Sequence, residues 1–365
     1  MSLLTHLANV PDFRHASGNF RHPLLSILVI TVLAVLCGAD DFEDIADFGQ
    51  QKQAVLARHL ALPHGVPSAD TFRRVFQHLD AKAFNDAFLG WVRAMLPAPV
   101  AAQICVDGQT LRGSGPDALH LVSALARAEG VCLAQVATAG KGRELAAIPA
   151  VLALLDLSDG ALVSLDALGC QPAIAAQIQH QGGQYLLALK QNQATLYAEA
   201  ERALTGVRPQ HTATGWASHN TPVRWQGAVQ TDLRWVDEDG RWPALAALVR
   251  VETTRYPPDG APQAQAPRYY LSSQADLSAA EALAAVRGHW AVENQLHWHL
   301  DVTLRQDAHR LRDQRAAENL ALVRKMALHL LRADPSKGSL KLKRKRLGWN
   351  DEFLEQLVQQ IAKCV

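Results

Sequence analysis

Three acidic residues have neighbours that point to metal-dependent chemistry. Asp107 and Asp166 each end an apolar run that predicts a buried strand, and Glu293 lies in residues 287–307, which predict a helix. Two carboxylates brought close together repel each other unless a divalent cation neutralises them. Carboxylate oxygens are hard ligands that suit Mg²⁺. Two such ions about 3.5–4 Å apart could stabilise both the attacking and the leaving oxygen of a phosphoryl transfer.

Each carboxylate also has an ordinary structural explanation. Asp107 precedes Gly108, and an Asp-Gly pair at the end of a strand is foremost a turn signal. Glu293, taken alone, would be a paired surface residue. Asp166 is harder to explain in this way because it interrupts the apolar run ALVSLDAL. Both faces of a parallel sheet should be covered there, and an unpaired carboxylate would be costly.

The helix predicted around Glu293 would place imidazole and indole rings beside this carboxylate. Residues three or four apart share a helix face, which places His289 and His297 beside Glu293 and Trp290 on the adjoining stripe. We expect the histidines to orient Glu293 or to contact a phosphate, and Trp290 and Trp298 to anchor the helix to the sheet. Zinc is less consistent with the sequence, because no His-Glu-x-x-His motif is present.

The order of the elements that follow residue 98 predicts how the two aspartates meet. Three strands, a helix, a strand, a helix and a strand are predicted in turn at residues 102–108, 120–126, 131–138, 144–155, 160–169, 172–182 and 184–190. This is the order of a ribonuclease H type of sheet, in which the first and fourth strands lie side by side. Such a sheet would bring Asp107 and Asp166 together.

The rest of the chain predicts two further parts. Residues 1–97 look all-helical and end at a linker, Pro97-Ala98-Pro99, after which residues 98–365 form the α/β domain. Within that domain, residues 205–275 predict a β-rich insertion of alternating runs separated by turns. Four tryptophans of the insertion could stack on unpaired bases, although we favour packing in a small core; they are Trp216, Trp225, Trp235 and Trp242.

The composition is ordinary for a globular protein. Of 365 residues, 48% are hydrophobic and 19% are charged, and the net charge of +1 argues neither for nor against nucleic acid. Five cysteines without C-x-x-C spacing suggest neither a disulfide framework nor a cysteine zinc site, which fits a reducing cytoplasm. The apolar run at residues 24–39 is shorter than a membrane span. We therefore expect a core helix there and no membrane partner.

The motifs around the three acids resemble a known family. VDGQTLRGS, SLDALGCQ, LALKQNQATL and HWAVENQLHWHLDV are similar to the DDE transposases of bacterial insertion sequences, specifically the H-repeat-associated (ISAs) group. The resemblance also includes GVPSADTFRRVF and KGSLKLKRKRLGWNDEFL, and it covers nearly the whole chain. It implies a helical associated domain before a ribonuclease H-like domain. In that domain Asp107, Asp166 and Glu293 would bind two Mg²⁺ or Mn²⁺ ions to nick and join DNA ends, commonly as a dimer.

This sequence departs from the family pattern at a few positions. Gln109 stands where Lys is usual, Gln306 replaces an acid, and SHNTPVRWQGAV matches the usual central motif only loosely. Gln109 would remove a cation beside the metal ligands. Two alternatives follow: a metal-dependent nuclease without strand transfer, and a domesticated DNA-binding remnant.

Two basic stretches are candidates for contact with double-stranded DNA. Residues 67–80 predict a short basic helix that could enter the major groove in a helix-turn-helix arrangement. Residues 305–346 hold thirteen Lys or Arg against four acids, and we expect KLKRKR at 341–346 to be a basic loop. The candidate nucleic-acid contacts are His289, Asn294, His297, Arg73, Arg74, Lys341, Lys343, Arg344, Lys345 and Arg346.

Overall fold

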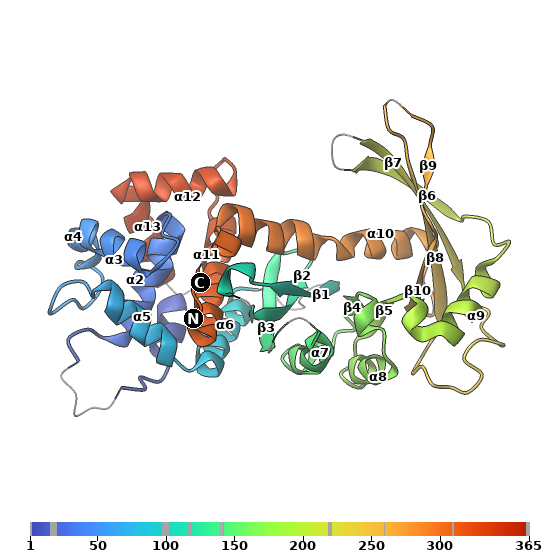
Figure 1. Cartoon of the computed structure of the whole chain (residues 1–365), viewed down its shortest axis with the longest axis horizontal. Coiled ribbons are helices and arrows are strands. Elements are labelled where there is room, and N and C mark those ends of the chain that lie inside the picture. Colours follow the sequence, from blue (N-terminus) through green and yellow to red (C-terminus); the bar gives the residue numbers. More distant parts are fainter. Residues whose placement is uncertain are drawn as a thin grey trace.

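A computed structural model of the chain shows an elongated arrangement of three parts (Figure 1). A cluster of helices lies at one end, a sheet with helices on both faces lies in the middle, and long antiparallel strands lie at the other end. The structure describes residues 2–14, 20–96, 102–115, 118–138, 140, 142–217, 221–258, 260–308 and 310–362. The predicted linker at residues 97–99 lies outside these ranges.

The helical end is built around an apolar helix, α2 (Leu24–Cys37), which is buried along nearly its whole length because apolar side chains occupy all of its faces. The other N-terminal helices are α1 (Leu3–Ala8), α3 (Phe42–Gln51), α4 (Gln53–Leu56), α5 (Ala69–His78) and α6 (Ala81–Met95). Asp41 and Asp80 cap α3 and α6 with side-chain oxygens. Within the described ranges, no single helix is long and apolar enough to cross a membrane; α2 and α3 meet that test only as a pair bent by 95°.

The last three helices return to the helical end. They are α11 (Gln314–Ala333), α12 (Leu340–Trp349) and α13 (Asp351–Ala362). Helices α11 and α12 pack on α2, and α13 packs on α1 and α12. Ion pairs join Lys52 to Asp351 (2.6 Å) and Arg58 to Glu355. Residues 341–346 are helical, so the expectation of a basic loop there is wrong.

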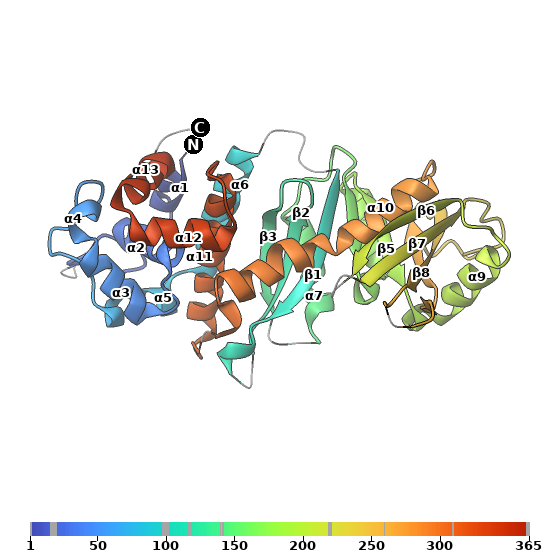
Figure 2. The same ribbon diagram turned by 90° about the horizontal axis from the view of Figure 1, so that it is seen from above.

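The central strands have the order that the sequence predicts. They are β1 (Gln103–Thr110), β2 (His120–Ala126), β3 (Val131–Thr138), β4 (Leu162–Leu165) and β5 (Gln184–Leu189). Their order is β3-β2-β1-β4-β5, with antiparallel pairing among β1, β2 and β3 and parallel pairing of β1 with β4 and of β4 with β5. Helices α7 (Glu144–Ala153) and α8 (Pro172–His180) cover one face, while α10 (Ala279–His289) crosses the other (Figures 1 and 2).

The β-rich insertion continues the same sheet. Its elements are α9 (Ala194–Leu204), β6 (His211–Ala217), β7 (Thr221–Gln230), β8 (Ala247–Arg255), β9 (Gln263–Ala264) and β10 (Arg268–Ser272). Strand β10 pairs antiparallel with both β5 and β8. All ten strands that the described residues form therefore belong to one sheet.

The four tryptophans of the insertion have different surroundings. Trp242 is buried in the core, as expected, and the half-buried Trp225 carries the Arg287 guanidinium 4.1 Å from its ring centroid. Trp216 and Trp235 are exposed, so the core expectation is wrong for these two. Residues 218–220 of the loosely matching central motif lie outside the described ranges.

The stretch at residues 287–307 is not one regular helix. Helix α10 begins earlier, at a capping box formed by Ser278 and Glu281, and ends at His289. Two π-helical turns follow, at Val292–His297 and His299–Thr303; we call residues 292–303 the π segment. A π turn bonds residue i to i+5 and not i+4, and such turns occur frequently at functional sites. The predicted α-helical spacing nevertheless holds for His297, which lies beside Glu293, but it does not hold for His289.

Candidate active site

Asp107 and Asp166 come from neighbouring strands at the edge of the sheet where β4 ends. Strands β1 and β4 are parallel and pair Val106 with Leu165, so the residue after each of these two is the aspartate; Asp107 lies within β1, and Asp166 directly follows β4. Burial raises the pKa of Asp107 to about 6, and the nearby charge of Asp166 adds to this effect. The adjacency of the two aspartates, predicted from the order of the elements, is confirmed.

Asp166 is exposed, in contrast to the buried strand position that the sequence suggests. Strand β4 ends at Leu165, and Asp166 Oδ1 accepts hydrogen bonds from the backbone N–H groups of Leu168 (3.0 Å) and Gly169 (3.3 Å). These bonds cap a short 3₁₀ turn. The carboxylate interrupts the apolar run because the strand stops there, and the turn fixes its position.

The π segment brings Glu293 to Asp107. The imidazole of His297 lies between them, with Nδ1 3.3 Å from Glu293 Oε2 and 3.9 Å from Asp107 Oδ2. One ligand atom from each of the three residues lies within 4.8 Å of the others. The hydrogen bond with His297 is the main reason why the pKa of Glu293 lies below its usual value. Two carboxylates and an imidazole in this arrangement could hold a divalent ion.

Glu293 and the two indoles that flank it are exposed to solvent. The Glu293 side chain is 55% exposed, and the flanking Trp290 and Trp298 are 54% and 49% exposed. The expectation that these indoles anchor the helix to the sheet is therefore wrong. His289 lies away from Glu293, with its Nδ1 3.1 Å from Ser164 Oγ, and burial lowers its pKa.

The side-chain amide of Gln109 is bonded to Asp301 and not to the cluster formed by Asp107, Glu293 and His297. Its Nε2 lies 2.9 Å from each carboxylate oxygen of Asp301, and its Oε1 accepts a hydrogen bond from Gln306 (3.2 Å). The sequence predicts that Gln109, in place of the usual Lys, removes a cation beside the metal ligands. In the structure, the amide of this residue contacts Asp301. Sequence reasoning did not identify Asp301 as a site residue, although it lies four residues after His297, a spacing that places two side chains on one helix face.

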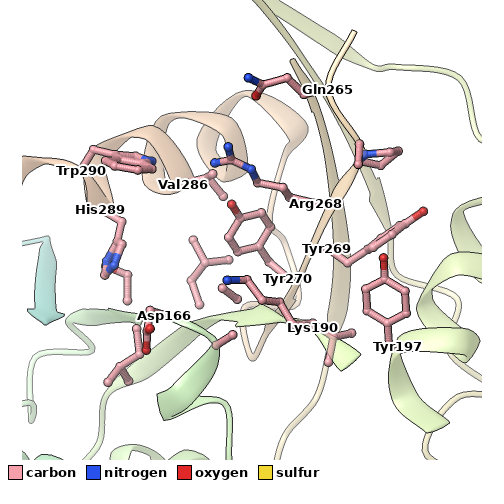
Figure 3. Close-up of a pocket in the computed structure, with 18 residues that line it drawn as sticks. Asp166, Lys190, Tyr197, Gln265, Arg268, Tyr269, Tyr270, Val286, His289 and Trp290 are labelled. Carbon is pink, nitrogen blue, oxygen red and sulfur yellow. The ribbon is translucent and has the colours of Figure 1, made fainter. Parts of the chain in front are cut away.

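A cavity of about 570 Å³ opens beside Asp166, between the ends of β4, β5 and β10 and the end of α10 (Figure 3). Lys190, Arg268 and Tyr270 line it from the strands, and Trp290 lines it from the end of α10. Sequence reasoning did not assign Lys190. It could have been found, because Lys190 directly follows β5 just as Asp166 directly follows the neighbouring strand β4.

Part of the predicted DNA-contacting set lies on the surface. The exposed members are Arg74, Asn294, Lys341 and Lys345. Arg73 forms ion pairs with Glu43 and Asp70, which offset its charge, and Arg346 donates to the Lys337 carbonyl.

Three members of this set, His297, Lys343 and Arg344, are buried, so the prediction that they face DNA is wrong. Lys343 and Arg344 are each 8% exposed. Lys343 Nζ donates to the carbonyl of Leu331, while Arg344 donates to the carbonyls of Val35 (3.0 Å) and Thr303 (2.8 Å). A buried charge needs such partners. These two side chains therefore join α12 to other elements.

Comparison with known proteins identifies the family. The model of the transposase DDE domain matches residues 99–330, and the model described as DDE_Tnp_1-associated matches residues 4–92. The chain belongs to the DDE transposase family. Its function is accordingly that of a DNA transposase.

Relatives of this transposase are similar along their whole length. It is 35% identical to "Putative transposase YncI" of Escherichia coli O157:H7, over 100% of this chain and 95% of the relative. It is 32% identical to "H repeat-associated putative transposase YhhI" of Escherichia coli K12, over 98% and 97%. The H-repeat-associated resemblance is confirmed. A cryo-EM structure of a piggyBac transposase synaptic complex with hairpin DNA matches 99% of this chain and 77% of its own, with a TM-score of 0.45 and 12% identity, too weak a likeness to carry an argument.

Proposed function

We propose that this transposase nicks DNA at the ends of an insertion sequence and joins the freed 3′-OH to target DNA. Asp107, Asp166 and Glu293 form the single site for both steps. The observation that carries the proposal is the placement of the two aspartates on adjacent parallel strands, with Glu293 brought to the same edge of the sheet by the π segment. We further propose that β1–β5 form a ribonuclease H-like catalytic core within residues 98–365.

The donor set fits a divalent ion such as Mg²⁺ or Mn²⁺. Carboxylate oxygens of Asp107 and Glu293 lie within 4.8 Å of each other, and oxygen is the preferred ligand of such ions. Burial raises the pKa of Asp107 to about 6, so a cation nearby would offset the cost of its charge. The family generally uses divalent ions; two ions held by the three carboxylates would act as Lewis acids on the scissile phosphate.

The side chains of the site differ in how firmly they are held. Asp166 is fixed by the turn that it caps, so its position is set before DNA binds. Glu293 is exposed and can adjust as the other ligands assemble. The buried His297 keeps Glu293 directed at Asp107. Ligands held near their final geometry reduce the entropy that is lost during the reaction.

The cavity beside Asp166 gives a path for the DNA strand that is cut. Lys190 and Arg268 are exposed cations on its wall, and Trp290 and Tyr270 supply flat rings (Figure 3). Cations neutralise backbone phosphates without reading their sequence. We propose that Lys190 and Arg268 contact the phosphates next to the scissile one.

Further contacts with double-stranded DNA are assigned to surface residues on other elements. Arg74 on α5 and Lys341 and Lys345 on α12 are exposed and remain candidates. We propose that residues 1–97 act as a helical associated domain that helps to hold an element end. A homodimer would hold the two ends together. We propose action in the bacterial cytoplasm, where the element DNA lies.

The test is cleavage of DNA that carries the element's own ends, with Mg²⁺ or Mn²⁺ compared with EDTA. Metal-dependent nicking at the end boundary should disappear in Asp166→Asn and Glu293→Gln, while end binding persists. Nicking by either variant at the wild-type rate would refute the three-carboxylate site. A second assay supplies pre-nicked ends and target DNA. Nicking without joining would identify a nuclease, and end binding without either reaction would identify a DNA-binding remnant.

A further inference from the structure

Gln109 joins strand β1 to the π segment two residues beyond Asp107. Its buried side chain places Nε2 2.9 Å from both Oδ1 and Oδ2 of Asp301. At the other end of the amide, the buried Gln306 donates its Nε2–H to Gln109 Oε1 at 3.2 Å. An amide carries its donor and acceptor on opposite branches. The orientation of Gln109 is therefore fixed, because the inverted amide would set its oxygen against the carboxylate of Asp301.

The Gln109–Asp301 contact acts on the same two elements that bring Glu293 to Asp107. Side chains two apart on a strand lie on one face, so Asp107 and Gln109 both face the π segment. On that segment His297 and Asp301, four residues apart, face β1. The two contacts together fix the register between strand and segment. A π turn is rare and its bonds differ from those of an α-helix, so contacts from outside must select it here.

Without the contact from Gln109, Asp301 would be a further carboxylate with no partner at this position, close to Glu293 and His297. Burial and the charge of Asp307 raise its pKa to about 6, the charge of Glu293 adds to this, and the hydrogen bond from Gln109 opposes it. Both of its oxygens lie within hydrogen-bonding distance of the Gln109 amide. While that contact holds, Asp301 is kept away from the set formed by Asp107, Glu293 and His297.

We infer that Gln109 and Asp301 form a positioning clamp, which holds the π segment in the register where Glu293 faces Asp107 and keeps Asp301 out of the metal-binding set. This inference rests on the proposed function. Both are positioning residues, because they act through the segment that carries Glu293. A lysine at position 109, the usual residue in the resembling family, would also present an N–H donor to Asp301.

The clamp is tested on the full chain without DNA, by calorimetric titration with Mn²⁺. Gln109→Leu removes the donor at similar volume, and Gln109→Lys restores one. Mn²⁺ should bind about tenfold more weakly to Gln109→Leu, in the range found when a partner of a metal ligand is removed, and close to wild type to Gln109→Lys. Amide hydrogen exchange across residues 292–303 should be faster in Gln109→Leu alone.

Asp301→Ala breaks the clamp from the other side, so the proposal can still be tested if one variant fails to fold. It should weaken Mn²⁺ binding to a similar degree, and the double variant with Gln109→Leu should add little, because the two residues form one contact. Wild-type Mn²⁺ affinity in both single variants would overturn the clamp. Weakening that Gln109→Lys does not restore, or that merely follows a fall in thermal midpoint, would also overturn it.

Asp107→Asn separates failure of the clamp from failure of the proposed function. If Asp107→Asn abolishes Mn²⁺ binding while Gln109→Leu and Asp301→Ala both leave it unchanged, only the clamp is wrong. If Asp107→Asn itself binds Mn²⁺ as well as wild type, the proposed metal site falls, and the clamp falls with it.

Discussion

His297 Nδ1 lies 3.3 Å from Glu293 Oε2, and the imidazole that makes this contact is buried while the carboxylate is exposed. The buried ring is thus a fixed point on the π segment, and Glu293 is the part that can move. Asp107 Oδ2 lies 3.9 Å from the same nitrogen. The buried ring therefore holds Glu293 by a hydrogen bond on the side of the site where Asp107 lies, before other ligands arrive.

Replacing His297 should impair cleavage more than it impairs folding. His297→Leu keeps most of the buried volume but removes the donor to Glu293. Partners that orient metal ligands contribute about 10–100-fold to affinity or activity, so single-turnover nicking should fall by about that factor. The matched control is His299→Leu, because His299 bonds Thr303 and not the cluster. Equal losses in the two variants would argue against the orienting role.

Lys190→Ala should weaken DNA binding in a salt-dependent way. If Lys190 neutralises one phosphate of the strand in the cavity, its loss should reduce the log–log slope of affinity against salt by about 0.7–0.9. Affinity measured by fluorescence anisotropy from 50 to 200 mM salt gives that slope. The control is Lys82→Ala, an exposed lysine of α6 that is paired with Asp86. A slope unchanged from wild type would remove Lys190 from the DNA path.

Arg344 and Lys345 are neighbours in the sequence with opposite expected roles. Arg344 is buried and donates to backbone carbonyls of α2 and the π segment, and it lies 3.2 Å from Asp40. A buried acceptor that loses its donor costs about 1–3 kcal/mol, and Arg344→Met removes the donor of two carbonyls, so it should lower the free energy of unfolding by about 2–4 kcal/mol.

Lys345 provides the comparison for that measurement because it is exposed. Lys345→Ala should leave the free energy of unfolding within about 0.5 kcal/mol of wild type and reduce the salt dependence of DNA binding. Urea unfolding and binding isotherms on the same two proteins measure both quantities. If Arg344→Met had the same free energy of unfolding as wild type, the buried hydrogen bonds of Arg344 would not contribute to stability.

The strand order and the meeting of Asp107 with Asp166 could be predicted because both follow from topology. A parallel sheet with helical connections places the ends of its strands at one edge, so the order of strands and helices was sufficient. The position of Glu293 could not be predicted in the same way. The α-helical spacing of 3.6 residues places both His289 and His297 beside Glu293, whereas α10 ends at His289, a π turn follows, and only His297 lies beside Glu293.

Burial of charge was the other feature that the sequence did not reveal. KLKRKR predicts a solvated basic run, yet Lys343 and Arg344 are buried because carbonyls from distant elements accept their hydrogen bonds. Those carbonyls belong to no motif, so they cannot be found by pattern. Asp166 shows the reverse case, since the apolar residues around it predict burial while its cap leaves the carboxylate exposed.

The pH dependence of stability should carry a contribution from His329 on α11. This imidazole is buried against Phe88 and Trp91, and its Nε2 accepts the backbone N–H of Cys132 at 2.9 Å. Burial lowers its pKa to about 3, from 6.5 in the unfolded chain. Below pH 6.5 the unfolded chain therefore binds a proton that the folded chain does not.

Stability must then fall as the pH is lowered from 6.5 towards 3, and this contribution is fully present above pH 6.5. The slope approaches about 1.4 kcal/mol per pH unit once the unfolded histidine is protonated. His329→Gln keeps an acceptor for the Cys132 N–H but does not titrate in this range. Urea unfolding of both proteins from pH 8 to pH 5 should give curves that diverge below pH 6.5, with wild type losing more stability. Parallel curves would mean that His329 titrates alike in the folded and unfolded chains, and they would contradict the contribution argued from its burial.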